Sequence, residues 1–274
     1  MKKSLTETTF IIPLRIDSDD RLRNSITVIS FLLHHFDTTI ILHEIDTEPK
    51  FRMHALPKIR EIIDTNNLEY KFLKNEKKEF HRTKIINDML MEVKTKVVCN
   101  YDIDILLELD SYKTAQELII TNDIGLVYPF GEGSAYEYGV KYNSAIKEKF
   151  FRSGFDLNFL KINADLHSAR HGHCQFFNTH SYIKYGLENE NFIGWGYEDD
   201  ERFFRFSKFL KVRRIDKMVY HLDHKRNSSF YCENNNKTLL NEIKKMDMEQ
   251  LSSYYKNQDY YINRRDQLNK RGKS

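Results

Sequence analysis

The hydrophobic pattern of the N-terminal part of the chain alternates between strand-sized and helix-sized stretches. Four short runs of apolar and β-branched residues predict strands at residues 9–14, 38–43, 69–73 and 96–99. Three helical segments are predicted between them, at residues 21–36, 55–64 and 80–93. Because strands and helices alternate, we expect an α/β fold with a mostly parallel sheet and right-handed crossovers.

Beyond residue 110 the pattern is looser. It predicts a helix at residues 114–121, a strand at residues 124–128 and a glycine-rich loop at residues 131–133. From residue 135 onward aromatic residues are frequent and we expect longer helices, followed by strand-like runs at residues 211–215 and 218–224. Three consecutive asparagines, 234–236, break the pattern before a predicted outer helix at residues 239–255. We therefore expect one domain over residues 1–232, with halves that meet near residue 130, and a helical C-terminal extension over residues 233–274.

Composition narrows the class of protein. The 274 residues are 40% hydrophobic, 13% aromatic and 30% charged, which is typical of a folded, soluble protein. No apolar run approaches the ~20 residues of a membrane-spanning helix, and a polar segment follows the first lysines where a signal peptide would be apolar. The three cysteines are far apart and form no CxxC pair. These features predict a cytoplasmic protein.

Charge limits the possible partners. The formal net charge is only +3 and no aromatic residues interleave with a basic stripe, so we expect no nucleic-acid partner. Basic residues are concentrated at residues 264–273. This tail is either a solvated helix end or a peripheral contact with an anionic surface, which would be the inner face of the membrane.

The only tryptophan of the chain lies between two glycines, in the run Gly194-Trp195-Gly196-Tyr197, and three carboxylates follow at Glu198, Asp199 and Asp200. An amphipathic pattern begins here, so the carboxylates fall in the first turn of a predicted helix. The electropositive start of a helix favours an ionised carboxylate, which can accept a proton from a hydroxyl. Ordinary helix-start chemistry explains the same residues equally well.

Two further groups point to a metal. Asp102 and Asp104 follow the strand at residues 96–99, and in extended backbone they would point to the same side. The carboxyl ends of parallel strands bind ligands in open α/β sheets, and oxygen ligands suit Mg²⁺ or Mn²⁺. His221 and His224 end the strand-like run at residues 218–224 and would suit Mn²⁺. Each group also has a bland explanation, as a polar strand end or as surface histidines.

Taken in order, these motifs resemble those of GT-A-fold glycosyltransferases, closest to the β-1,4-galactosyltransferase-like group and to related domains of bacterial chondroitin-type polymerases. Five segments carry the resemblance, within about residues 9–226: a strand with Pro13 and Arg15, the helix that begins at Phe80-His81-Arg82, the Asp102-Ile103-Asp104 motif, Gly194–Asp200 and Met218–His221. The resemblance implies a GT-A fold, with a mostly parallel sheet flanked by helices.

The resemblance also implies roles for individual residues. Asp104 and His221 would bind Mn²⁺ or Mg²⁺, with Asp102, Met218 and His224 as possible further ligands. The nucleotide and the sugars would be bound by the remaining motif residues, namely Pro13, Arg15, Arg82, Asp102, Trp195, Gly196, Glu198 and Asp200. Asp199 would be the general base. The implied reaction is inverting transfer of a hexose or N-acetylhexosamine, of galactose type, from a UDP-sugar to a saccharide hydroxyl.

Two departures from the family pattern stand out. Tyr197 occupies the position of a third glycine, and the segment His173-Cys174-Gln175 replaces small glycines. The acceptor and donor pockets are therefore expected to differ from those of the family. A hydrolase of nucleotide sugars or glycosides, and a non-catalytic carbohydrate-binding module, are the competing interpretations.

Overall fold

The computed structural model describes residues 2–77, 79–194, 196–225 and 233–271. Its main sheet has seven strands in the order β10-β6-β9-β4-β1-β2-β3. Their bounds are β1 Lys3–Leu14, β2 Phe36–Asp46, β3 Leu68–Lys74, β4 Val97–Tyr101, β6 Leu126–Tyr128, β9 Cys174–Asn178 and β10 Val212–Arg214. All neighbours pair in parallel except β9, which lies antiparallel between β4 and β6. The predicted mostly parallel sheet is confirmed.

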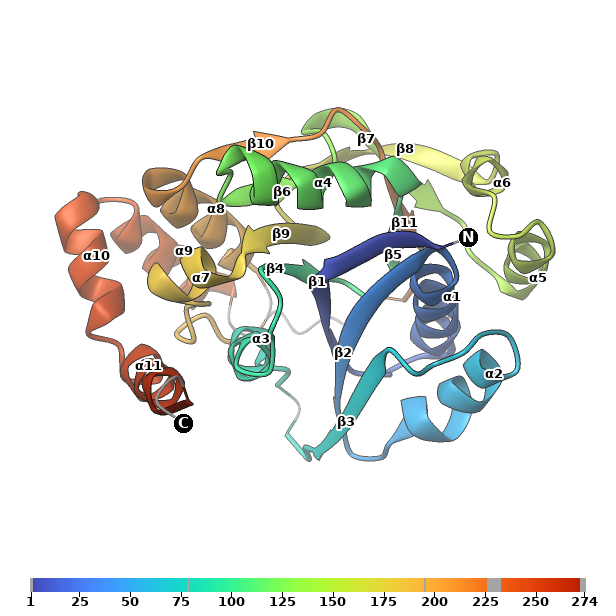
Figure 1. Cartoon of the computed structure of the whole chain (residues 1–274), viewed down its shortest axis with the longest axis horizontal. Coiled ribbons are helices and arrows are strands. Elements are labelled where there is room, and N and C mark those ends of the chain that lie inside the picture. Colours follow the sequence, from blue (N-terminus) through green and yellow to red (C-terminus); the bar gives the residue numbers. More distant parts are fainter. Residues whose placement is uncertain (1, 78, 195, 226–232, 272–274) are drawn as a thin grey trace.

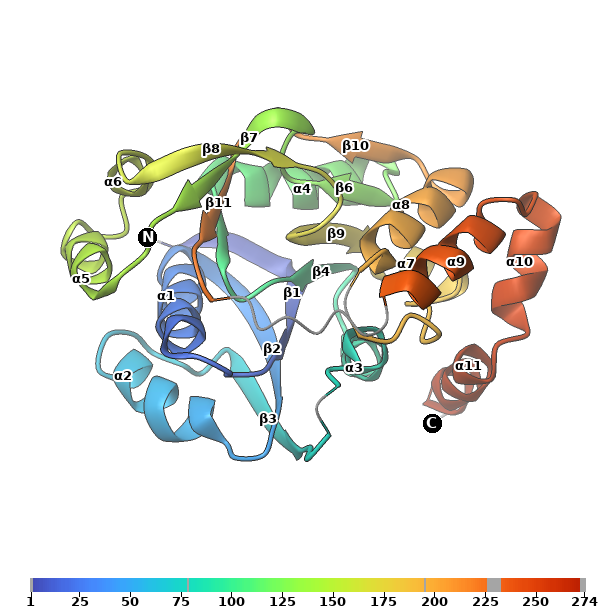
Figure 2. The same ribbon diagram turned by 180° about the vertical axis from the view of Figure 1, so that it is seen from behind.

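Helices cover this sheet, as Figures 1 and 2 show. The helices before residue 170 are α1 Asp19–His35, the π-helical η1 Phe51–Ala55, α2 Leu56–Arg60, α3 Arg82–Leu90, α4 Leu109–Asn122, α5 Ser144–Arg152 and α6 Leu157–Lys161. The later ones are α7 Thr179–Lys184, α8 Glu198–Phe209, α9 Glu233–Ile243, α10 Met248–Lys256 and α11 Asp259–Arg271. α9, α10 and α11 lie at one end of the molecule beside α7 and α8, and α5 and α6 lie at the other (Figure 1).

The elements predicted in the first part of the chain are present. β1 has no exposed residue from Thr8 to Leu14, because the strand is central in the sheet and covered on both faces. α1 begins after Ser18, whose side chain accepts a hydrogen bond from the Arg21 amide, and Asp19 and Asp20 occupy its first turn. Local signals of this kind are sufficient to predict β1 and α1, because a buried apolar run and a helix cap each involve only a few consecutive residues.

The prediction of longer helices after residue 135 is wrong. This region instead contributes three strands, β7 Gly133–Val140, β8 Ala164–Ala169 and β11 Val219–Leu222, to a second sheet in the order β5-β11-β7-β8, whose fourth strand is β5 Ile105–Leu107. β8 is largely exposed, and only three of the eight residues of β7 are buried, so neither strand carries a continuous apolar run. Their extended conformation depends on strand pairing: β7 pairs with β8, and β7 also pairs with β11, which is distant in sequence.

The C-terminal segment also differs from expectation. The predicted helix at residues 239–255 is two helices, α9 and α10, because Asp247 and Gln250 form a capping box that starts a new helix. Of the basic tail, Arg264 is buried and pairs with Asp88 at 2.6 Å and Glu190 at 2.5 Å, while Lys273 lies outside the described residues. Among the helices of the described ranges, none has the length and apolar composition to cross a bilayer.

α8 contains two arginines, Arg202 and Arg205, that are fully buried, although the charged residues of an amphipathic helix usually face solvent. Arg205 donates to Glu201 Oε1 at 2.7 Å and to the backbone oxygens of Tyr185 and Leu187, each at 2.6 Å. The Tyr255 hydroxyl of α10 also donates to Glu201. The guanidinium is tolerated in the interior because every side of it is paired.

We expect Glu201→Ala to lower the free energy of unfolding by about 3–5 kcal/mol, because it leaves the Arg205 charge buried and unpaired. Glu117→Ala is the control: its ion pair with Lys113 is more than half exposed, at 54% and 56%, so about 0.5 kcal/mol is expected. Urea denaturation of both variants checks this. Equal losses would show that the buried pair is not a special source of stability.

Candidate active site

The carboxylates of the Asp-x-Asp motif do not lie side by side. β4 ends at Tyr101, and the chain then turns through Asp102 and Asp104 to enter β5 of the second sheet. The prediction that both point to one side in extended backbone is therefore wrong. Asp102 accepts a hydrogen bond from Arg82 at 2.6 Å, whereas Asp104 faces two histidines. The two residues therefore have separate partners, and only Asp104 belongs to a cluster of potential metal ligands.

The first cluster, which we call the histidine cluster, consists of Asp104, His221 and His224. One carboxylate oxygen and one nitrogen of each ring all lie within 4.8 Å of one another. β5 and β11 bring them together, since Ile105 is paired with His221 in the antiparallel ladder. Asp104 is nearly buried, and its Oδ2 lies 2.7 Å from Arg21 Nη1 and 3.1 Å from His224 Nε2. Burial raises the pKa of Asp104, but these partners outweigh it and hold the pKa below its usual value.

Glu137 of β7 orients the histidine cluster. Its two carboxylate oxygens accept hydrogen bonds from His173 Nε2 at 2.9 Å and from His221 Nδ1 at 3.0 Å. Because a carboxylate only accepts, His221 carries its proton on Nδ1, and a neutral ring then has its lone pair on Nε2. A carboxylate behind a histidine is the usual support of a metal-binding imidazole. One carboxylate and two imidazoles suit a divalent cation such as Mn²⁺, so the residues present fit such an ion.

The second cluster, the acidic cluster, lies at the start of α8 and contains Glu198, Asp199 and Asp200. As predicted, these carboxylates occupy the first helical turn. Asp199 Oδ1 accepts a hydrogen bond from Arg202, and Asp200 Oδ1 accepts one from His171 Nδ1 at 2.9 Å. The hydrogen bond from His171 lowers the pKa of Asp200 and overcomes the opposite effect of burial.

Glu198 has the most unusual environment of the three. Its side chain is buried, and within the described residues its Oε2 atom has no hydrogen-bond partner. Burial, and next the charge of Asp199, raise the pKa of Glu198 to about 7. Arg82 lies close enough for its charge to act against this shift, and its own Nη1 is buried with no partner in the described part of the chain. A donor, Arg82 Nη1, and an acceptor, Glu198 Oε2, are thus both unsatisfied at the acidic cluster within the described residues.

The segment His171–Gln175, which leads into β9, connects the two clusters. His171 bonds Asp200, while a Cβ on Gly172 would lie 3.3 Å from Asp199 Oδ2. His173 bonds Glu137 through its ring and accepts from the Asp102 amide through its carbonyl, at 3.0 Å. Gln175 accepts from Arg202 Nη1 at 3.2 Å. The antiparallel position of β9 therefore sets the distance between the histidine cluster and the acidic cluster.

Other predicted site residues have different surroundings. Pro13 is buried in β1. Arg15, just after β1, donates to the backbone oxygens of Ile45 at 3.1 Å and of Glu79 at 3.4 Å, so it ties the end of β2 to the loop before α3. Met218 precedes β11 and packs, partly buried, against the main core. The Gly196 carbonyl accepts from Asn236 at 3.0 Å, and Trp195 lies outside the described residues.

Both departures from the family's glycine pattern involve a left-handed backbone. Tyr197 and His173 each have φ of 69°, a conformation that glycine adopts without strain and other residues rarely adopt. Glycine would adopt this conformation without strain at both positions, whereas Tyr197 and His173 adopt it at an energetic cost. Their rings make contacts that glycine would lack, with Glu137 for His173 and with the C-terminal helices for Tyr197.

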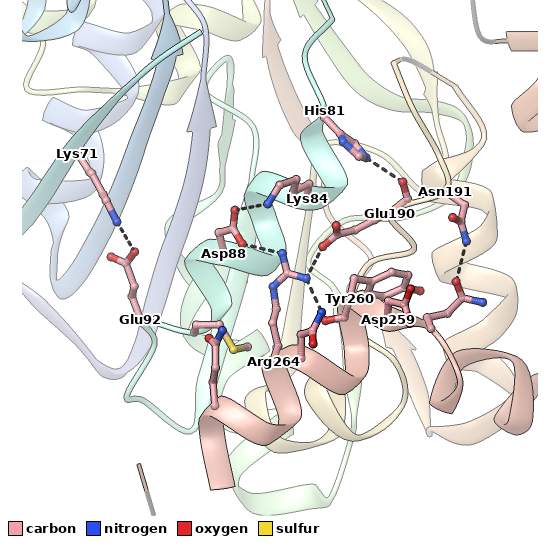
Figure 3. Close-up of a pocket in the computed structure, with 14 residues that line it drawn as sticks. Lys71, His81, Lys84, Asp88, Glu92, Glu190, Asn191, Asp259, Tyr260 and Arg264 are labelled. Carbon is pink, nitrogen blue, oxygen red and sulfur yellow. Dashed lines mark hydrogen bonds and ion pairs between the residues drawn. The ribbon is translucent and has the colours of Figure 1, made fainter. Parts of the chain in front are cut away.

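A cavity of about 330 Å³ adjoins the histidine cluster and is lined by Glu137, Gly139, His167, Ser168, His221, Asp223 and His224. A larger cavity, of about 750 Å³, lies between α3 and α11, where Arg264 bridges Asp88 and Glu190 (Figure 3). Its lining contains none of the residues of the histidine or acidic clusters. The chemistry is therefore concentrated away from the larger cavity.

Sequence reasoning missed several residues of the site. Glu137, His171 and Arg21 contact predicted site residues but belong to no motif. Arg202, which is held by Glu188 and donates to Asp199, also belongs to no motif. Its spacing of three from Asp199 was a usable signal, because residues three apart are neighbours on a helix. The others are distant in sequence and carried no comparable signal.

No protein-family model matches the chain, and no curated protein matches it. Solved structures do. Mannosyltransferase PcManGT from Pyrobaculum calidifontis, with GDP-Man and Mn²⁺, shares 10% identity at a TM-score of 0.50, over 84% of this chain and 60% of that one. GalNAc-T7, with UDP, GalNAc and Mn²⁺, shares 14% sequence identity at a TM-score of 0.55, and the match covers 86% of this chain and 47% of that one. S. aureus TarS 1-349, with UDP-GlcNAc, shares 13% identity at a TM-score of 0.55, and the match covers 94% of this chain and 72% of that one.

These likenesses show the fold: the chain has the GT-A fold of these glycosyltransferases. It spans 60% of the length of the first of these proteins and 47% of the second.

The raised pKa of Glu198 predicts how the stability of the protein depends on pH. The folded chain binds this proton more tightly than the unfolded chain, so between pH 4.5 and about 7 the folded state holds more protons. The free energy of unfolding should fall as the pH rises through this window, by an amount on the order of 3 kcal/mol. Glu198→Gln removes the ionisation, so its stability relative to wild type should increase from pH 4.5 to pH 8.

Thermal melts of Glu198→Gln against pH measure this effect, with Glu148→Gln as the control because Glu148 is exposed on α5. The control should keep a nearly constant difference from wild type. A pH-independent difference for Glu198→Gln would contradict the assigned environment.

Proposed function

We propose that this chain is a metal-dependent glycosyltransferase that moves a sugar from a nucleoside-diphosphate donor to a hydroxyl of a saccharide acceptor. The main support is the occurrence, in a GT-A fold, of a three-residue metal-type cluster and a carboxylate cluster that share the segment His171–Gln175. We further propose that residues 1–232 form the catalytic unit and that transfer inverts the anomeric centre.

We propose Asp104, His221 and His224 as the ligands of a divalent cation, with Mn²⁺ as the first choice because two of the three are imidazoles. Such a cation would neutralise the charge of the departing diphosphate. Glu137 would keep His221 in the ligating tautomer. Arg21, which lies 2.7 Å from Asp104, would add positive charge on the same side.

Asp199 is proposed as the general base. Arg202 fixes its Oδ1 atom, while its Oδ2 atom faces Gly172, where the absence of a side chain leaves room for an acceptor hydroxyl. Holding one oxygen and leaving the other toward open space orients the carboxylate for proton transfer. Arg202 is itself fixed by both oxygens of Glu188, at 2.7 and 2.8 Å.

Glu198 and Arg82 are proposed to hold sugar hydroxyls. A hydroxyl both donates and accepts, so it would satisfy the unpartnered Glu198 Oε2 and Arg82 Nη1 atoms of the acidic cluster. Asp200 would bind a second hydroxyl beside His171. We propose Asp102 for the ribose or metal side of the donor, where it is held by Arg82. The donor proposed is a UDP-sugar of galactose type; UDP and UDP-GlcNAc accompany two of the similar structures and GDP-Man a third.

Thermal shift assays test the function. UDP with Mn²⁺ should raise the melting temperature by several degrees, because a ligand at a hundred times its Kd stabilises by about 2.7 kcal/mol. UDP alone should do little, and His221→Ala should remove the Mn²⁺-dependent part. Comparing the shift caused by GDP and Mn²⁺ with the shift caused by UDP and Mn²⁺ shows which nucleotide the protein binds. A protein indifferent to every nucleotide, with and without Mn²⁺, would contradict the proposal.

We expect Asp199→Asn to lower kcat by about 10²- to 10⁴-fold while the Kd of the donor stays unchanged, because it removes only the proton acceptor. Asp200→Asn is the neighbouring control and should raise the acceptor KM more than it lowers kcat. Product analysis distinguishes transfer from hydrolysis, since free sugar formed without an acceptor would identify a hydrolase. Near-normal turnover in Asp199→Asn would rule out the assigned base.

A further inference from the structure

One buried side chain of the C-terminal helices reaches the segment that precedes the acidic cluster. Asn236 of α9 is 2% exposed. Its Nδ2 atom donates to the carbonyl oxygen of Ile193 at 3.1 Å and to that of Gly196 at 3.0 Å. An amide nitrogen has two hydrogens, so both are used, and both acceptors are backbone groups just before α8. The contact therefore acts on the path of the chain rather than on a neighbouring side chain.

Apolar packing restrains the same segment at both of its ends. Phe192 is a member of a core cluster with Leu240 and Ile243 of α9 and Leu251 and Tyr255 of α10, and the ring of Tyr197 packs against this cluster. Tyr197 is also the left-handed residue at the entry to α8, with φ 69° and ψ −8°. Glycine at this position would have the backbone conformation without the ring contact.

The helices that provide these contacts are themselves fixed to the body of the protein. Asn191 donates to the Tyr254 hydroxyl at 3.2 Å and to Gln258 at 3.0 Å. On α11, Arg264 lies between Asp88 of α3 and Glu190, as Figure 3 shows. α10 and α11 are thus held to the body of the protein, and α9 shares an apolar cluster with α10, so these helices can support the segment before α8.

We propose that Asn236 is a positioning residue of the active site: through the carbonyls of Ile193 and Gly196 it sets the backbone that delivers Glu198, Asp199 and Asp200. The inference rests on the proposed function, in that these carboxylates are taken to bind sugars. It makes α9 and α10 part of the site rather than an appendage. It also gives Tyr197 a role in holding α9 and α10, in place of direct contact with an acceptor.

The chain offers a matched pair of variants. Asn236→Asp keeps the size of the side chain but replaces the donor by an acceptor, which repels both carbonyls. Asn235→Asp introduces the same charge at the preceding residue of α9, which is exposed. Trp195 is the only tryptophan in the chain and stands between Ile193 and Gly196 in sequence, so its fluorescence reports on this segment without any substrate.

We expect Asn236→Asp to change the acrylamide quenching constant of the tryptophan at least twofold and to raise the acceptor KM about tenfold, whereas Asn235→Asp changes neither. The tenfold figure corresponds to the loss of roughly one hydrogen bond. If Asn236→Asp does not fold, Asn236→Ala and Asn235→Ala are compared in the same assays.

A lower melting temperature with quenching and KM equal to those of the control would overturn the proposal, since Asn236 would then only stabilise the fold. The quenching arm needs no transfer reaction, so it decides the role of Asn236 even if the chain proves not to be a glycosyltransferase. An altered quenching constant with no transfer by wild type would refute the function and keep the positioning role.

Discussion

The buried guanidinium of Arg202 connects the acidic cluster to the rest of the fold. It donates to both oxygens of Glu188, to Gln175 of β9 and to Asp199 of α8, and none of its surface is exposed. A buried charge is stable only when it is fully paired, so these elements are tied to one geometry. Burial raises the pKa of Glu188, but the arginine more than reverses this shift.

The same constraint explains why the site has two halves at a fixed separation. Gln175, which accepts from Arg202, continues the segment whose His173 bonds Glu137 behind His221. β9 lies antiparallel between β4 and β6, so this segment passes between the Asp102–Asp104 turn and α8. A change in the position of β9 would alter the distance between the proposed cation site and the proposed base, on which the proposed transfer would depend.

Much of the fold was predictable because its signals are local. Buried strands such as β1 are continuous apolar runs, and α1 begins at a side-chain cap with acidic residues in its first turn. β7 and β8 gave no such signal, since β8 is largely exposed, β7 has no continuous apolar run, and the two strands pair with each other. Periodicity also does not reveal that Arg202 and Arg205 are buried, because it carries no information about Glu188 and Glu201, which neutralise them.

The sequence by itself determined strands β1 to β4, β6 and β10 of the central sheet, but not β9. It also determined the helical start at Glu198 and the residue types available for metal and proton chemistry, because each depends on neighbours a few positions away. It also singled out Asp104, His221 and His224, which the structure brings within reach of one cation. Only the tertiary structure decided that Asp102 turns toward Arg82, that Glu137 supports His221 and that Asn236 holds the chain ahead of the acidic cluster. These contacts join residues separated by many positions, and their geometry is set by packing of the whole fold rather than by local preference.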